Sequence, residues 1–286
     1  MKNSLTNGWR KSMDKKSFFT YIVQTFSKEI EQGKFLFNEC INGVKVDLFI
    51  PSKKMAFKLR GYCWDENGYQ KPKNEVKHFL NLGIRLMNIY DYEWKMFQEN
   101  FQTFIYHTIR SRNKHLIRSN RVVQISKEEF LNFLKSNHLF GDTIGGCRIM
   151  YGVYEKGELV AVAGFDKKSR KYDWEFKRFC VKYGWMTKPN FVKVFLNEFE
   201  KEHKGILVDY QQMDRFGYDN YPDGDLGFVK SRWNGGVVAI NTDTMNYTRH
   251  SFIAEKPLTK QETMEKYGFN MEIPNAGTTT WIKEIK

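Results

Sequence analysis

Closely spaced cysteines are absent from this sequence. Its four cysteines are Cys40, Cys63, Cys147 and Cys180, and no two of them lie closer than 23 residues. The sequence therefore has no CxxC pair and lacks the ligand spacing of a structural zinc site. Each cysteine has apolar or aromatic neighbours in the sequence. We therefore expect buried free thiols in a reducing compartment.

Long apolar segments are also missing. No stretch is apolar over the roughly 20 residues that a membrane-spanning helix needs. The N-terminal segment, MKNSLTNGWRKSMDKK, is basic but lacks the apolar run of a secretory signal. We expect a soluble, intracellular (cytoplasmic) protein with no membrane partner.

Acidic residues are fewer than basic ones. The chain has 33 Asp and Glu against 46 Lys and Arg, which gives a formal net charge of +13 and a pI of about 9.4. This surplus favours polyanionic partners, nucleic acid first and an anionic membrane second. A solvated basic surface without a specific partner is the simpler alternative. With 41% hydrophobic and 16% aromatic residues, the chain has enough apolar side chains for a packed core.

The first third of the chain has the pattern of a small α/β unit. Apolar residues at helical spacing predict a helix over 17–32, and three apolar runs predict strands over 35–41, 45–51 and 55–64. A helix over 74–83, a strand over 84–90 and a long helix from 91 complete this part.

A second α/β pattern follows a basic segment at 114–126. Ser126 and Glu129 form the sequence of a capping box at the start of a helix, and Lys156-Gly157 marks the turn of a β-hairpin. Later strands and helices follow, with a closing strand at the C-terminus. We predict an α/β (α+β) fold with domains at 1–113 and 127–286, joined by a linker at 114–126.

One predicted hairpin, KVDLFIPSKKMAFKLRGYCW, has charged residues on neighbouring strands. Metal-dependent DNA cleavage needs hard oxygen ligands beside the scissile phosphate. Asp47 is one such ligand, but Lys45 shares its strand face, and Lys58 and Arg60 share a face of the second strand. The cations oppose metal binding and suit phosphate. A salt bridge from Asp47 to Lys58 or Lys45 is the structural alternative.

This hairpin resembles that of the phage-encoded Hef-like homing endonucleases, whose nuclease domain is related to the very-short-patch-repair (Vsr) endonuclease of the PD-(D/E)XK superfamily. The positions that match are Asp47, Pro51, Ala56, Gly61 and Trp64. LGIRLMNIYDYEW, HLFG, YGVYEKGELVAVAGF, WEFKRFC and PNAGTTTWI are also similar to family segments, and together the matches cover roughly 30–286. The resemblance implies a PD-(D/E)XK-like nuclease fold followed by a mixed-sheet domain similar to the GNAT acetyltransferases.

Three positions depart from the family pattern. Lys45 and Lys58 replace glutamates, and Asp65 replaces the histidine that follows the tryptophan. We expect a degenerate catalytic site in which Asp47 binds a metal weakly at most, with Asp65 as a candidate replacement carboxylate. In the second half, the segment that would cradle a cofactor pyrophosphate contains only Gly184, and Pro189 removes one N–H donor. We expect no cofactor, with Mg²⁺ only if the nuclease is active.

The segment HTIRSRNKHLIRSNR is the strongest candidate for DNA contact. Its cations could neutralise phosphates, together with Arg60 of the hairpin; they are Arg110, Arg112, Lys114, Arg118 and Arg121. The alternative is a solvated helix end and linker.

Three functions are open at this point. The favoured one is a phage-type DNA-binding protein derived from a homing endonuclease, with its nuclease site inactivated by the acid-to-lysine replacements. The alternatives are an active metal-dependent double-strand DNA homing endonuclease and a GNAT-type acyltransferase.

Overall fold

The computed structural model describes residues 15–61, 70–110, 115–141, 147–168, 171–213, 226–241, 243–244, 247–248, 255, 257–269 and 271–286. The chain has a mixed α/β (α+β) fold, as the sequence predicts. It divides into two compact units. The first comprises Met1–Met96, Gln212–Gly217 and Trp233–Thr278, and the second comprises Phe97–Gln211, Tyr218–Arg232 and Thr279–Lys286. Neither unit is continuous in sequence, and the domain boundaries expected at 113 and 126 stay predictions.

The first unit is built on a four-stranded sheet with the order β1-β4-β5-β6. Its strands are β1 (Leu36–Phe37), β4 (Leu48–Ile50), β5 (Met55–Arg60) and β6 (Arg85–Tyr90). β4 and β5 are antiparallel and are joined by a short 3-10 turn, η1 (Pro51–Lys53). β5 and β6 are parallel because helix α2 (Gln70–Asn81) forms the crossover between them.

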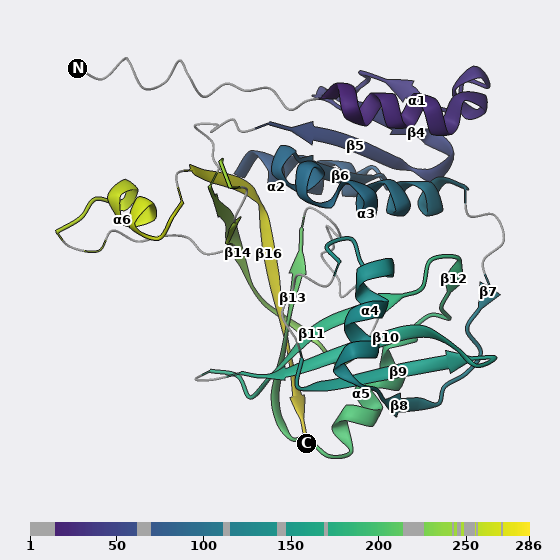
Figure 1. Ribbon diagram of the computed structural model, residues 1–286, viewed down its shortest axis with the longest axis vertical. Helices are drawn as coiled ribbons and strands as arrows, with labels where there is room; N and C mark the ends of the chain where they lie inside the picture. The colour runs from purple at the N-terminus through teal and green to yellow at the C-terminus, as the bar shows by residue number, and fades with distance from the viewer. Residues whose placement is uncertain are drawn as a thin grey trace. The chain divides into compact units, whose positions relative to one another are not determined.

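Helices cover both faces of this sheet (Figure 1). Phe18 of α1 (Lys15–Glu31) packs against Phe57 of β5, with ring centroids 6.3 Å apart. On the other face, Val76 and Phe79 of α2 pack with Ala56 of β5. Consecutive residues of a strand point to opposite faces, so β5 directs Phe57 towards α1, and Ala56 towards α2.

Two of the strand predictions for this unit need correction. The runs at 35–41 and 45–51 are each interrupted, which leaves β2 (Cys40–Ile41) and β3 (Val44–Lys45) as a separate two-stranded hairpin. Asn38 takes a positive φ of 54°, which breaks the extended conformation of the first run, and Asn42, with a φ of 46°, lies in the turn between β2 and β3. Asp47 lies between β3 and β4 rather than within one long strand.

Helix boundaries also differ from the sequence predictions. α2 starts at Gln70 instead of Asn74, since Pro72 falls in the first turn, where proline is tolerated. The long helix is α3 (Asp91–Arg110), which is kinked at Phe97, where φ is −126°.

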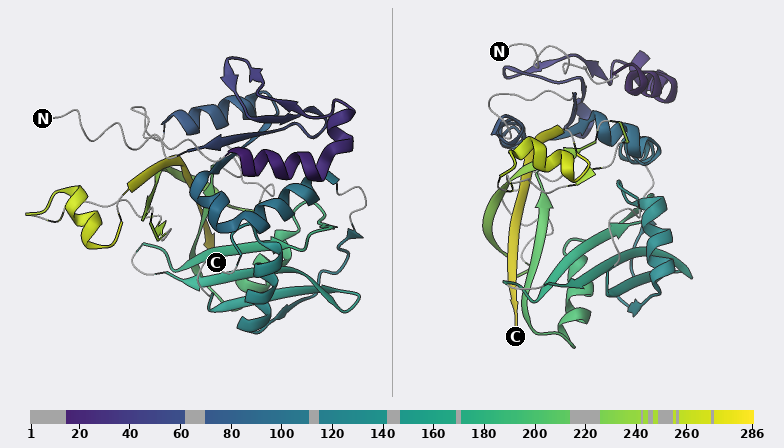
Figure 2. Two further views of the ribbon diagram at one scale, coloured as in Figure 1. Left: turned by 45° about the horizontal axis from the view of Figure 1, so that its top comes forward. Right: turned by 60° about the vertical axis from the view of Figure 1, so that its left-hand side comes forward.

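The second unit contains five neighbouring strands in the order β13-β11-β10-β9-β8. They are β8 (Val122–Gln124), β9 (Ile149–Glu155), β10 (Glu158–Lys167), β11 (Trp174–Val181) and β13 (Gly205–Gln212). The β9–β10 hairpin turns at Lys156 and Gly157, both with positive φ, as the sequence predicts. Helix α4 (Lys127–Asn137) and helix α5 (Val192–Glu200) lie on opposite faces of the sheet (Figure 1 and Figure 2).

Two apolar clusters hold these helices. Phe195 and Phe199 of α5 pack with Phe165, whereas Phe130 of α4 packs with Val162. The predicted capping box of α4 is confirmed, because Ser126 accepts from Glu129 N at 3.1 Å and Glu129 accepts from Ser126 N.

The remaining elements are short, except for two long strands. β7 (His115–Leu116) pairs with β12 (Trp185–Met186). The two long strands are β14 (Val229–Ile240) and β16 (Met271–Ile285), and each contributes residues to both units. The strand order there is β15-β14-β16, and β15 spans Tyr247–Thr248. α6 (Lys260–Lys266) has its own capping box at Thr259 and Glu262. No described helix has the length and apolar character needed to cross a membrane.

The expectation of buried thiols is confirmed in part. Cys147 and Cys180 are buried and free, whereas Cys40 is exposed. Cys40 lies in the small β2–β3 hairpin, outside the main sheet. Cys63 falls outside the described residues.

Candidate functional site

Asp47 is held rigidly beside strand β5. Only 5% of the residue is exposed. Its carboxylate oxygen Oδ2 accepts from Leu59 N at 2.7 Å, and its main-chain N–H donates to the carbonyl of Phe57 at 3.0 Å. The other carboxylate oxygen pairs with Lys15 at the start of α1. The cation that partners Asp47 therefore comes from the first helix rather than from Lys45 or Lys58.

Lys58 and Arg60 share the face of β5 that is turned towards α2, as their spacing predicts. Both pair with one carboxylate, that of Glu75 on α2: Lys58 Nζ lies 2.8 Å from Glu75 Oε1, and the Arg60 guanidinium bonds to Oε2. Arg60 Nε also donates to Asn88 Oδ1 at 2.7 Å. The side chains of Lys58, Arg60 and Glu75 are 19%, 14% and 11% exposed, so the trio is mostly removed from water.

Burial and charge act together on this trio. Burial lowers the pKa of Lys58, the hydrogen bond to Glu75 opposes that shift, and the charge of Arg60 adds to it. Burial would raise the pKa of Glu75, but Arg60 and Lys58 together outweigh it and lower that pKa. The pKa of Lys58 is thus lowered by burial and by the charge of Arg60 in spite of Glu75, whereas the pKa of Glu75 is lowered by the two cations that share its carboxylate.

The donor set does not fit a magnesium ion. Mg²⁺ needs carboxylate oxygens that are available for coordination. Here Asp47 already binds Lys15 and a main-chain N–H, and Glu75 already binds two cations. Among the residues that the structure describes, no group of three or more His, Cys, Asp or Glu side chains could hold a metal. Asp65, the candidate replacement ligand, lies outside those residues.

Three members of this network were missed by sequence reasoning: Lys15, Glu75 and Asn88. A signal for two of them was present. Glu75 lies three residues after Pro72 and four before Phe79, so it falls on the apolar face of its helix. Asn88 is a polar residue inside the apolar run RLMNIY and is fully buried. Lys15 follows a basic N-terminal segment and offered no comparable signal.

The predicted DNA-contact segment is described in part. Arg118 and Arg121 are exposed in the segment between β7 and β8. The carboxylate of Glu155 accepts from Arg118 N at 2.9 Å and from Ser119 N at 2.8 Å, and these N–H groups lower the pKa of Glu155. The main chain at Arg118 is thus anchored while its side chain reaches solvent.

The other cations of that prediction are less exposed or are not described. Arg110, at the end of α3, is half-buried, with its guanidinium carbon 5.7 Å from the centre of the Tyr106 ring. Arg112 and Lys114 lie outside the described residues, and the role of this segment's cations in DNA binding stays a prediction. Lys45, expected only as a degenerate catalytic position, is exposed in β3.

The start of α5 does not fit a pyrophosphate. A helix N-terminus binds phosphate through main-chain N–H groups that have no partner within the protein. Here the N–H groups of Phe191, Lys193 and Val194 donate to the carbonyls of Lys188, Asn190 and Phe191, at 2.9 to 3.2 Å. Three of the donors that would face a cofactor are therefore already in use.

Comparison with known proteins finds no match among protein-family models and none among curated proteins. Solved structures with partial likeness are of two kinds. The catalytic domain of the homing endonuclease I-Bth0305I is 16% identical, with a TM-score of 0.27, and the match covers 34% of this chain and 93% of that one.

The second kind comprises acetyltransferases. An aminoglycoside 6'-acetyltransferase type Ii is 13% identical, with a TM-score of 0.35, and covers 58% of this chain and 97% of its own. A GNAT family acetyltransferase from Elizabethkingia anophelis, solved with acetyl-CoA bound, is 14% identical, with a TM-score of 0.29, and covers 57% of this chain and 97% of its own. At these values the likenesses establish no family for the chain.

Proposed function

We propose that this chain is a DNA-binding protein whose nuclease-like hairpin has lost metal-dependent cleavage. One observation carries the proposal. The hairpin position at which the resemblance places a metal-binding glutamate holds Lys58, and Lys58 is locked to Glu75 together with Arg60. A divalent cation would have to displace ammonium and guanidinium groups from the nearest carboxylates, which is electrostatically unfavourable.

The charge balance supports DNA as the partner. A net charge of +13 attracts a polyanion over long distances. Arg118 and Arg121 are exposed, and Glu155 holds the main chain of Arg118 in place. Arginine on a rigid main chain loses less conformational entropy when it binds phosphate. We therefore place phosphate contacts on this segment, whereas Arg60 is already occupied by Glu75 and Asn88.

Binding is tested by titrating duplex DNA of mixed sequence with the full chain over a series of salt concentrations. We expect the association constant to fall steeply with salt, and the double variant Arg118→Gln/Arg121→Gln to lower the slope of log K against log salt by about 2, since each lost phosphate contact contributes about 0.9. The matched control is Lys127→Gln/Lys193→Gln, which removes the same charge from two other exposed positions. Weak, salt-independent binding by the unmodified chain would disprove DNA as the partner.

Loss of cleavage is tested separately. Supercoiled plasmid is incubated with the protein and Mg²⁺ or Mn²⁺, and we expect no nicking. Asp47→Asn is the control, because an asparagine keeps an oxygen acceptor for Leu59 N–H while removing the charge. Cleavage by the unmodified chain that disappears in Asp47→Asn would support the active endonuclease instead.

An acyltransferase activity is the weaker proposal. The N–H groups of Phe191, Lys193 and Val194 donate within the protein, so the start of α5 offers few donors to a cofactor phosphate. A thermal shift assay with acetyl-CoA tests it, and we expect no rise in the unfolding temperature.

A further inference from the structure

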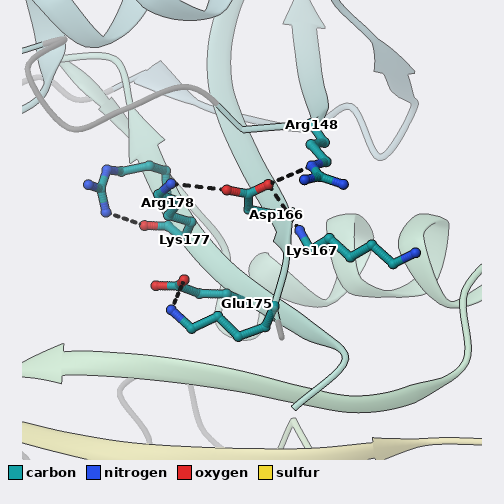
Figure 3. A network of polar contacts seen from close by, with 7 residues as sticks. Arg148, Asp166, Lys167, Glu175, Lys177 and Arg178 are labelled. Atoms are coloured by element: carbon teal, nitrogen blue, oxygen red, sulfur yellow. Dashed lines mark hydrogen bonds and ion pairs between the residues drawn. The ribbon is translucent and has the colours of Figure 1, made fainter. Parts of the chain in front are cut away.

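A second group of basic residues lies on the sheet of the second unit, away from the segment at 107–121. It consists of Arg148 before β9, Lys167 at the end of β10, Lys168 after it, and Lys177 and Arg178 on β11, with the carboxylates of Asp166 and Glu175 between them (Figure 3). We refer to these seven residues as the β10–β11 cluster. Sequence reasoning did not single it out, because its members come from three separate segments.

The two carboxylates hold three of the cations in position. Asp166 pairs with Arg148 at 3.4 Å and with Lys177 at 3.2 Å, and Glu175 pairs with Lys168 at 2.8 Å. The exposed fraction of these cations varies: the side chain of Arg148 is 69% exposed and that of Lys168 is 38% exposed. The two carboxylates are fewer than the five cations, so positive charge remains at the solvent-exposed side chains.

A β-bulge brings this charge together. Gly164 pairs with Arg178 and Phe165 pairs with Phe176, so Lys177 is the extra residue on β11. A bulge of this kind changes the direction of the side chains beside it. In Figure 3, Lys177 and Arg148 reach Asp166 from opposite sides. The Arg178 guanidinium meanwhile donates to the main-chain carbonyl of Lys177.

Aromatic rings lie beside two of the cations. Lys168 Nζ lies 5.4 Å from the centre of the Tyr210 ring. Lys167 Nζ lies 6.0 Å from that of Trp174, which packs against Phe199 on the α5 face of the sheet. Burial raises the pKa of the Tyr210 phenol, and the charges of Lys168 and of exposed Arg232 oppose that shift. Arg232 thus adds its positive potential to the same region.

The cluster keeps a positive potential although its acids stabilise the cations. Burial lowers the pKa of Lys168, but Glu175 and Asp166 outweigh it and raise that pKa. Five cations against two carboxylates nevertheless leave a surplus of positive charge, which attracts an anion. The cations come from adjacent strands spaced about 4.8 Å apart, so they extend over roughly 10 Å. That length matches several phosphates of one DNA strand, at about 3.4 Å of helix axis each.

We propose that the β10–β11 cluster is a second phosphate-contact surface for duplex DNA. The proposal rests on the DNA-binding function proposed above and assigns part of it to this surface. Arg148 and Lys168 contact phosphate, while Asp166 and Glu175 position the cations. Contacts of this kind fix the orientation of DNA without reading its sequence.

The test compares Arg148→Gln/Lys168→Gln with the unmodified full chain and with the control Lys127→Gln/Lys193→Gln, using duplex DNA of mixed sequence over a salt series. We expect the cluster variant to lose about tenfold or more in affinity and to show a salt slope smaller by about 2. The control should lose less than the cluster variant in both measurements. Circular dichroism and thermal unfolding check that each variant is folded, and Lys167→Gln/Lys168→Gln replaces the first variant if it is not.

The outcomes separate this proposal from the one on which it rests. If the unmodified chain binds DNA and the cluster variant matches the control in affinity and slope, the cluster is not a DNA contact, although the DNA-binding function stands. If the unmodified chain does not bind DNA, both proposals are wrong. A loss confined to the cluster variant supports both.

Discussion

Glu75 Oε1 lies 2.8 Å from Lys58 Nζ, which joins helix α2 to the central strand β5 of the first unit. The second carboxylate oxygen of Glu75 binds Arg60 from the same strand face. Lys58 is thus one member of an ion-pair network that joins the crossover helix to the sheet, and its carboxylate partner lies on that neighbouring helix.

The first prediction concerns the stability that this network provides. Glu75→Gln removes the charge that Lys58 and Arg60 share, and leaves two mostly buried cations without a counter-charge. Breaking a buried pair in this way costs about 3 kcal/mol. We expect the free energy of unfolding, measured by chemical denaturation, to fall by about that amount.

Glu31→Gln is the matched control for this measurement. Glu31 is exposed at the last residue of α1, and the loss of its charge should change stability by less than about 0.5 kcal/mol. A Glu75→Gln variant as stable as Glu31→Gln would mean that the network contributes nothing to folding.

The second prediction follows from the lowered pKa of Glu75. Because its pKa in the folded chain lies below the ordinary 4.5, the ionised carboxylate stabilises the fold above about pH 4.5, and this contribution is lost as the pH falls through the folded pKa. The difference in unfolding free energy between the unmodified chain and Glu75→Gln should therefore be constant near neutral pH and shrink in acid. A difference that stays constant into acid would contradict the ionised state of Glu75.

The third prediction separates a structural role of Asp47 from a catalytic one. Its carboxylate accepts a buried hydrogen bond from Leu59 N at 2.7 Å. Asp47→Ala leaves this N–H without an acceptor, at a cost of about 1–3 kcal/mol, whereas Asp47→Asn retains an oxygen acceptor. We expect denaturation to show a larger loss for Asp47→Ala than for Asp47→Asn. Equal losses would mean that the stability contributed by the Asp47 side chain comes from the charge pair with Lys15 rather than from the hydrogen bond to Leu59 N.

Features that depend on a few adjacent residues could be predicted from the sequence. The Ser126–Glu129 capping box and the Lys156-Gly157 turn are of this kind, and both predictions are confirmed. The pairing of Lys58 with Glu75 could not be predicted, since it joins residues 17 positions apart through the crossover geometry. Sequence spacing gave the right face for Lys58 and Arg60, but it could not show which carboxylate that face meets.

The β10–β11 cluster illustrates the same limit. Lys177 and Asp166 come together only because β10 and β11 are antiparallel with a register shift after Gly164. Alternation along β11 places Lys177 and Arg178 on opposite faces, and the bulge removes that alternation locally. A bulge of this type leaves no clear signal in a single sequence.

The fourth prediction tests the packing that supports that sheet. A Cβ atom added at Gly164 would lie 2.5 Å from Cys147 Sγ and 2.7 Å from Cζ of Phe130. All three groups are in the core beneath α4, so overpacking should cost about 1–3 kcal/mol. We expect Gly164→Ala to lower the free energy of unfolding by that amount.

Cys147→Ala supplies the second arm of a double-mutant cycle. On its own it removes a buried thiol, whose pKa is raised to about 11 by burial, and leaves a small cavity. Combined with Gly164→Ala, it removes the closest of the clashing atoms, so the double variant should be more stable than the sum of the two single losses predicts. Strict additivity in chemical denaturation would show that the added methyl group does not meet Cys147.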